Sequence, residues 1–345
     1  MKRLIFTIFI ASVTLSSFAQ LGGTSTYNFL RLTNSARLAA LGNNFAPVKD
    51  GDVTLSVANP SIIDEEMHND LALSFVDYYT DISYGFASYS RTFDKLGSFT
   101  GSVQYIDYGE TMETSAFEGD TLGYFSGLES ALTVGWARPL DSLLYIGANF
   151  KMITSSLYTY SSAGVAVDLA ATYHNPERRF TASLIFRNIG RQITYYEAGQ
   201  NEPLPFEVQL GFSKRLQHLP FRYSIVLTDL QKFDLTYVNP NSADNMPDPF
   251  TGEIEGDDEK GIADKLMRHV VIGGEFMPTK NFSLRFGYNY RLRQEMKVDS
   301  KLGTVGLSWG LGFRVSKFHF SYSRAAYHLV GSPNYITITT SLGEF

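Results

Sequence analysis

Carboxylate side chains crowd the segment 239–265, together with prolines and glycines. Closely spaced carboxylates are hard oxygen ligands of the kind that calcium prefers, although the spacing of an EF-hand loop is missing. The same composition is typical of a solvated, mobile loop, and loops of this length are often docking surfaces when ordered. The sequence leaves these interpretations open. The candidate docking residues are Asp244, Asp248, Glu253, Glu255, Asp257 and Asp258.

No other group of residues has the spacing of a catalytic or metal centre. The six histidines are scattered, and there is no His-Glu-x-x-His segment, nucleophile elbow or phosphate-binding glycine loop. Cysteine is absent, which excludes thiolate metal ligands and a cysteine nucleophile. The net charge of −6 gives no support to nucleic-acid binding. We therefore expect a non-enzyme without metal or cofactor, although a hydrolase triad assembled in space would escape this search.

Further charges lie on the polar face of strongly alternating segments. From Phe282 to Leu292, aromatic and aliphatic residues alternate with polar or charged ones, and a strand points successive side chains to opposite faces. Lipid would solvate the apolar face, and a watery or plugged lumen the polar one. The charged residues at such mid-strand positions are Glu129, Lys151, Asp168, Arg187, Glu207, Arg222 and Arg285.

The elements that position these residues form a regular series. Alternating segments bounded by turn residues predict fourteen strands, near 71–79, 82–93, 96–108, 123–138, 142–155, 161–175, 178–189, 204–216, 219–230, 266–278, 280–293, 301–315, 317–325 and 333–345. An even number of strands suits a closed antiparallel barrel. Phe345, the last residue, is a candidate signal for barrel assembly.

The connections between these strands alternate in length. Tight turns such as Asp94-Lys95 and Ser316-Lys317 alternate with longer polar links at about 109–122, 190–203, 231–265, 294–300 and 326–332. The first hairpin, around Thr80-Asp81, is an exception, because it is short on the side of the long links. Transmembrane barrels have short periplasmic turns and long external loops. A soluble sandwich or lipocalin-like barrel also alternates, but many of these strands exceed ten residues and carry mid-strand charges. We therefore predict an all-β transmembrane barrel in a bacterial outer membrane.

Residues 1–19 have the features of a secretory signal peptide. Lys2 and Arg3 precede an apolar run from Leu4 to Leu15, and Ser17-Phe18-Ala19 fits a cleavage site. About a dozen apolar residues fall short of the roughly 20 that a spanning helix needs. We expect cleavage after Ala19.

Residues 20–69 lack strict alternation. Thr33 or Asn34 is a candidate cap for a short helix from Ser35 to Leu41, Gly42 a candidate stop, and Asn59-Pro60 a turn. A barrel of about fourteen strands is too wide for its own side chains to fill. We therefore expect residues 20–69 to fold inward as a plug, ahead of a barrel over 70–345. Arg37 is then a candidate partner for Glu129, Asp168 or Glu207 in the lumen.

The same region resembles a known family. Its run Thr26-Tyr27-Asn28-Phe29-Leu30-Arg31-Leu32, the stretch containing Ser35, Ala36, Arg37 and Gly42, then Asp52 and Asn59-Pro60, is similar to the N-terminal signature of the PorQ/PorV proteins, with the PorQ branch the better match. These are outer-membrane barrels of the Bacteroidota type IX secretion system, similar to the long-chain fatty-acid channel.

The resemblance implies a fourteen-stranded barrel with an N-terminal hatch and a place in the cell-surface attachment complex. That complex processes secreted cargo and joins it to anionic lipopolysaccharide, and the barrel would hold a PorZ-like surface protein beside the PorU sortase and PorV. The alternative is a channel for hydrophobic small molecules, which needs a continuous apolar pocket. Candidates for that pocket are Phe117, Leu122, Tyr124 and Phe125.

Overall fold

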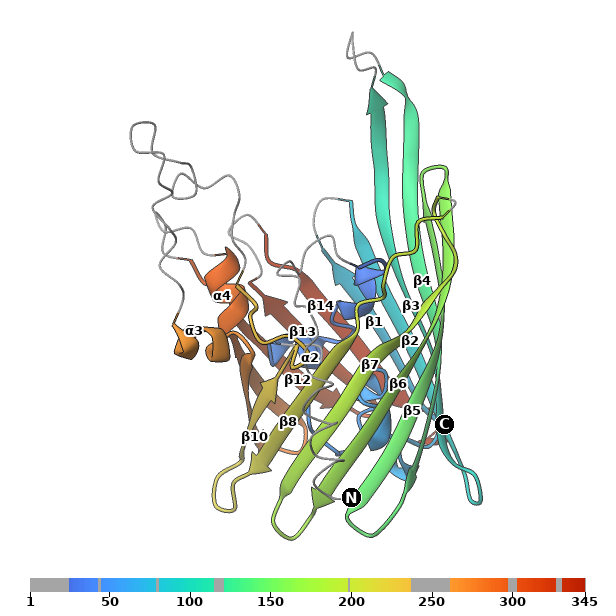
Figure 1. Cartoon of the computed structure of the whole chain (residues 1–345). Coiled ribbons are helices and arrows are strands. Elements are labelled where there is room, and N and C mark those ends of the chain that lie inside the picture. The colour runs from blue at the N-terminus through green and yellow to red at the C-terminus, as the bar shows by residue number, and fades with distance from the viewer. Residues whose placement is uncertain are drawn as a thin grey trace, which may run out of the picture.

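The computed structural model describes residues 25–42, 45–78, 81–114, 121–197, 199–236, 261–296, 303–326 and 331–344. Fourteen antiparallel strands form one closed barrel, in which each strand pairs with its neighbours in sequence and β1 pairs with β14 (Figure 1). The fold class expected from the alternation is therefore confirmed. One end of the barrel carries short turns such as the one between Phe93 and Gly97 and is called the turn side. The other end, called the loop side, carries the long connections and also the tight turn between Leu157 and Tyr160.

The strands differ widely in length. They are β1 Asp70–Asp77, β2 Ser83–Phe93, β3 Gly97–Thr114, β4 Thr121–Pro139, β5 Leu144–Leu157, β6 Tyr160–Asn175, β7 Phe180–Thr194, β8 Glu207–Arg215, β9 Phe221–Leu227, β10 Val270–Thr279, β11 Phe282–Asn289, β12 Leu307–Val315, β13 Phe318–Ala325 and β14 Asn334–Ser341. The wall is tallest at the β3–β4 hairpin, which projects far beyond the rest of the loop side in Figure 1.

The two faces of the wall divide as the alternation predicts. On β11, Phe286 is 56% exposed on the outer face, whereas Arg285 beside it is buried in the lumen. The same division holds on β5, where Phe150 and Met152 are exposed and Lys151 is buried. Apolar side chains cover the outside because lipid, not a protein core, solvates them.

Several connections differ from the expected ones. β3 and β4 pair up to Thr114 and Thr121, so most of the expected link 109–122 is strand, and β7 continues to Thr194 in the same way. β11 ends at Asn289, and residues Tyr290–Met296 form helix α4 instead of continuing the strand. Helix α3, Ile262–Met267, precedes β10. β14 ends at Ser341 and is followed by a 3-10 turn, Leu342–Glu344.

The N-terminal segment lies inside the barrel, as expected of a plug. It consists of short helical turns: η1 Asn28–Arg31, α2 Ala36–Ala40, η2 Val53–Leu55, η3 Pro60–Ile62 and η4 Glu65–Met67. α2 packs against β11 to β14, and η3 against β4 to β6 on the opposite wall. Leu38, Leu55 and Ile62 are fully buried there. Residues 25–42 and 45–69 are called the plug below.

No helix in the described part of the chain is both long enough and apolar enough to cross a membrane.

Candidate functional site

Helix α2 presents the central residue of the site, Arg37. The helix begins after Ser35, whose side chain accepts a hydrogen bond from the Leu38 amide, so Ser35 is the cap in place of Thr33 or Asn34. The helix stops at Gly42, which has a φ of +83°. A Cβ there would lie 3.2 Å from Val271 Cγ1, so glycine allows both the left-handed turn and the close approach to the wall.

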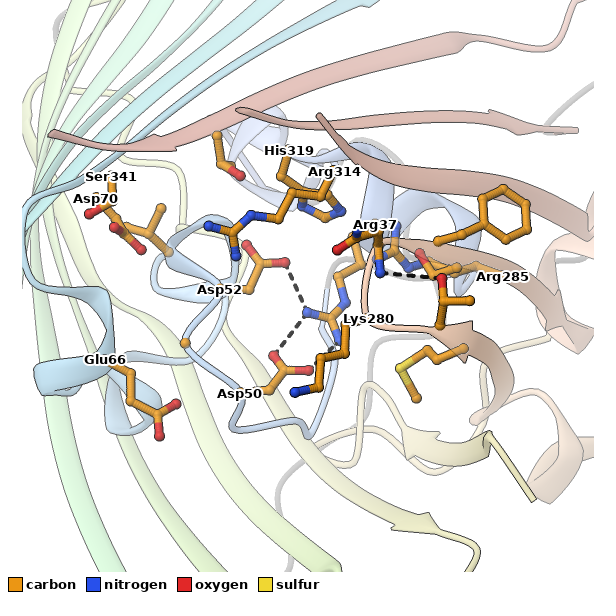
Figure 2. A pocket seen from close by; sticks show the side chains of 18 of the residues that line it. Arg37, Asp50, Asp52, Glu66, Asp70, Lys280, Arg285, Arg314, His319 and Ser341 are labelled. Atoms are coloured by element: carbon orange, nitrogen blue, oxygen red, sulfur yellow. Dashed lines mark hydrogen bonds and ion pairs between the residues drawn. The ribbon is translucent and has the colours of Figure 1, made fainter. Parts of the chain in front are cut away.

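Arg37 joins the plug to the wall through a buried ion-pair network. Its Nε donates to Glu275 Oε1 on β10 at 2.9 Å. Its Nη1 and Nη2 donate to Asp52 and Asp50 of the plug at 2.9 and 2.8 Å, and Figure 2 shows these two carboxylates beside Arg37. The expected partners Glu129, Asp168 and Glu207 are therefore wrong. They face the lumen, but at other positions.

Two arginines of the wall complete this network, which is called the Arg37 cluster. Arg222 on β9 pairs with both Asp50, at 2.8 Å, and Glu275, at 3.0 Å. Arg285 on β11 pairs with Glu275 at 3.0 Å. Three guanidinium groups thus face three carboxylates, counting Asp52, and the charges balance. A buried cluster is tolerated when every charge is paired and hydrogen-bonded, whereas loss of one partner leaves an uncompensated charge.

The electrostatics of the plug side of the cluster follow from this pairing. Burial by itself raises the pKa of Asp50, but the charges of Arg37 and Arg222 outweigh it and hold that pKa well below the ordinary range. Burial acts to lower the pKa of Arg37, and the neighbouring Asp50 and Glu275 more than reverse this effect. Arg37 and Asp50 are therefore both charged at neutral pH.

A second ionic contact holds the plug nearer the loop side. Arg31 pairs with Asp229, which follows β9, and lies 3.6 Å from Glu207 on β8. Asp229 also pairs with Arg291 of α4. The plug is therefore tied to the wall at two levels, and the upper tie includes a helix of the loop side.

Asn59 and Pro60 fix the plug against the opposite wall. The Asn59 side chain caps η3 by accepting from the Ser61 amide, and its Nδ2 donates to Thr172 and Ser183 at 3.3 Å each. Gly147 on β5 lies directly against Pro60, since a Cβ at Gly147 would approach the Pro60 carbonyl carbon to 2.5 Å. The expected turn is thus a capped 3-10 helix in close contact with the wall.

The remaining charges of the lumen pair within the wall or with the plug backbone. Lys151 lies 2.7 Å from Asp168 on the next strand and donates to Asn188 on β7 at 2.8 Å. Arg187 donates to the Leu30 carbonyl at 3.2 Å. Glu129 accepts a hydrogen bond from Tyr108 at 2.6 Å. Lys151 and Asp168 thus form an ion pair within the wall, whereas Glu129 and Arg187 are held by hydrogen bonds.

Two cavities open beside the Arg37 cluster on the turn side. The larger has a volume of about 870 Å³, and Figure 2 shows Arg37, Asp50 and Asp52 of the plug facing it together with Arg285, Arg314 and His319 of the wall. The smaller, of about 530 Å³, includes Lys49, His174 and Arg179 in its lining. Both linings are rich in charged side chains, unlike a pocket for an apolar molecule.

Sequence reasoning missed the partners of Arg37. A signal for Glu275 was present, because it lies one strand position from the exposed Phe276 and so on the lumen face of a predicted strand. Asp50 and Asp52 lie outside the predicted strands, where periodicity gives no direction. Their role depends on the path of the plug.

Other predicted residues are not brought to this site. The acidic docking residues Asp244, Asp248, Glu253, Glu255, Asp257 and Asp258, and with them the calcium question, lie outside the described residues, as do Phe117 and Phe345. Tyr124 and Phe125 belong to β4 instead of a loop, and Tyr124 is 65% exposed on the projecting hairpin. Within the described residues, no group of histidine, aspartate and glutamate side chains is placed to hold a metal ion.

Comparison with solved structures identifies the fold. The chain is similar to the toluene transporter TbuX of Ralstonia pickettii, with a TM-score of 0.52, 12% identity and coverage of 91% of this chain and 99% of that one. It is also similar to the toluene transporter TodX of Pseudomonas putida, with a TM-score of 0.53, 11% identity and coverage of 89% and 96%. The monoaromatic hydrocarbon channel CymD is similar as well, with a TM-score of 0.51, 10% identity and coverage of 90% of this chain and 98% of that one.

The chain thus shares its barrel fold with these proteins. A closed barrel with an apolar outer face is the form that outer-membrane proteins take. No protein-family model and no curated protein sequence matches the chain. The structural similarity establishes the fold. At identities of only 10–12%, the function must be argued from the site.

Proposed function

We propose that this protein is a non-enzymatic outer-membrane component of a type IX secretion system, with the plugged barrel as a fixed platform. Its external face would hold a PorZ-like surface protein beside the PorU sortase and PorV. The complex would process secreted cargo and join it to anionic lipopolysaccharide. The sequence signature from Thr26 to Pro60 supplies the link to this system.

The observation that favours a platform over a channel is the way the plug is held. Arg37 and Arg31 each bind carboxylates of the wall, and Asn59 hydrogen-bonds to the opposite wall. Opening the lumen would require these buried charges to separate, which is costly in a low-dielectric interior. A platform needs no such opening.

The projecting β3–β4 hairpin offers the platform an ordered external surface. At about 3.3 Å per residue and a tilt of about 40°, a strand of nineteen residues rises about 48 Å, against an apolar band of about 25 Å. Met112 and Tyr124 face each other across this hairpin and are 51% and 65% exposed. Exposed Tyr and Met side chains above the membrane are typical of protein docking surfaces.

A deletion strain tests the platform. Without the gene, the surface partner should appear in the culture medium and cargo should no longer be joined to lipopolysaccharide, both visible by immunoblotting of cell and medium fractions. A strain complemented with the wild-type gene is the control. Retention of the partner on the deletion cells would contradict the proposal.

The second candidate is a channel for hydrophobic small molecules. It is favoured by the shared fold with TbuX, TodX and CymD, whose names describe transport of toluene and passage of monoaromatic hydrocarbons. The two cavities on the turn side have charged linings, which do not suit the passage of a hydrophobic molecule. Growth on a long-chain fatty acid or an aromatic hydrocarbon, with and without the gene, would separate the two functions.

A further inference from the structure

Helix α3 has its apolar side turned away from the protein. Ile262, Leu266 and Met267 are 71%, 52% and 40% exposed, and Ala263 is exposed beside them. At 100° per residue these four positions span about 140°, so they form one continuous face of the helix. A surface helix of a soluble protein normally buries such a face.

The polar side of α3 contacts other elements of the loop side. Asp264 accepts a hydrogen bond from Tyr290 of α4 at 2.7 Å, besides pairing with Arg268 at the end of α3 itself. Lys265 pairs with Asp234 at 2.8 Å. These contacts fix the rotation of the helix, so the apolar face is held outward and is not free to turn inward.

The wall beneath α3 is no taller than the apolar thickness of a membrane. At a tilt of about 40°, the seven residues of β9 rise about 18 Å and the ten of β10, into which α3 leads, about 25 Å, against the band of about 25 Å that such barrels present. Figure 1 shows α3 at the outer edge of the barrel, beside the loop-side end of β10. The helix lies where the short wall ends.

We propose that α3 is seated in the outer leaflet of the membrane, with its apolar face among the acyl chains and its polar face against the barrel. The occupant is lipid because the apolar face continues a lipid-facing row. Ile272 and Phe276 follow on the outer face of β10 and are 45% and 39% exposed. The helix thus extends the apolar band above the β8–β11 wall, independently of the function proposed above.

Depth-dependent fluorescence quenching tests the seating of α3. The chain contains two tryptophans, Trp136 and Trp309, which are replaced by Phe. Leu266→Trp is then introduced, and the full-length protein is placed in nanodiscs containing one barrel and lipids with brominated acyl chains. We expect a loss of fluorescence comparable to that of Phe286→Trp, on the lipid face of β11.

One further variant provides the reference for a side chain outside the membrane. Tyr124→Trp, on the hairpin above the membrane, should be quenched by soluble acrylamide and not by brominated lipid. A heat-dependent shift in electrophoretic mobility verifies that each barrel is folded. The proposal is overturned if Leu266→Trp behaves like Tyr124→Trp. It is equally overturned if Leu266→Trp is protected from both quenchers, since protein would then cover the helix.

Discussion

The Arg37 cluster and the Lys151–Asp168 pair are both buried charge systems of the lumen, yet they connect different parts of the molecule. The carboxylates around Arg37 come from the plug and from β10, so the cluster bridges two segments that share no strand ladder. Lys151 and Asp168 lie on β5 and β6, which fourteen register pairs already join. Buried charge therefore serves attachment in one place and local packing in the other.

The largest expected effect is the release of the plug by Arg37→Ala. Asp50, Asp52 and Glu275 would lose their shared cation, and breaking a buried pair typically costs about 3–5 kcal/mol. Protease added from the turn side should cleave the N-terminal segment, and single-channel conductance should rise. Lys151→Ala is the matched control, expected to lower the thermal stability of the barrel while the plug stays protected. Unchanged protection and conductance in Arg37→Ala would refute the bridging role.

Glu275→Gln tests the attachment of the plug by changing the wall carboxylate that binds Arg37. It removes one charge from a carboxylate shared by Arg37, Arg222 and Arg285, so we expect a loss of plug attachment of about 2–3 kcal/mol. Hydrogen exchange of the plug amides measures it. Glu129→Gln, on the lumen face of β4 and hydrogen-bonded to Tyr108, serves as the control and should leave plug exchange unchanged. Equal exchange in the two variants would argue against a special role for Glu275.

Gly147→Ala probes the opposite wall without changing any charge. The new Cβ would lie 2.5 Å from the carbonyl carbon of Pro60, so plug and wall must move apart at a cost of about 1–3 kcal/mol. The midpoint of plug protection in a urea titration measures this cost. Gly101→Ala on β3 is the matched control, because nothing lies within 4 Å of its Cβ. Identical midpoints for both variants would contradict the close contact.

The smallest expected effect is that of acid, which should weaken the attachment of the plug to the wall. The pKa of Asp50 is depressed in the folded state, so its pairing contributes stability that is complete above the ordinary carboxyl value of about 3.9. That contribution is lost as the pH falls below about 4 toward the depressed pKa. Plug protection measured between pH 7 and pH 3 should decline only at the acid end. Asp50→Asn should remove this part of the decline, and a decline beginning near pH 6 would point to other groups.

The sequence predicts the strands of the barrel wall far better than the contacts of the plug inside it. All fourteen strands were expected, because lipid on one side and a polar lumen on the other impose alternation on every span. The predicted strand ends were wrong on the loop side, where the membrane no longer imposes alternation. Tyr290 and Leu292 continue the alternation of β11, yet Tyr290–Met296 is rich in helix formers and folds as α4. Conversely, polar residues up to Thr114 extend β3 through hairpin pairing alone.

The candidate site was predicted in part for a related reason. Local signals located the short helix, Gly42 as its stop and the structured Asn59-Pro60 element, since capping and turns depend on neighbouring residues. The partner of Arg37 depends on how an irregular segment crosses the lumen. Charge alternation in the wall supplies several equivalent carboxylates and does not choose among them.

A disulfide that locks the plug to the wall distinguishes the two proposed functions, because a platform functions with the lumen shut and a channel does not. Ser61 Oγ lies 2.7 Å from Thr172 Oγ1 across the plug–wall contact, and the chain has no cysteine of its own. The double variant Ser61→Cys/Thr172→Cys, oxidised in cells lacking the native gene, is compared with each single variant for attachment of cargo to the cell surface. We expect full attachment with the disulfide formed. Attachment that fails in the oxidised double variant and returns on reduction would refute the platform.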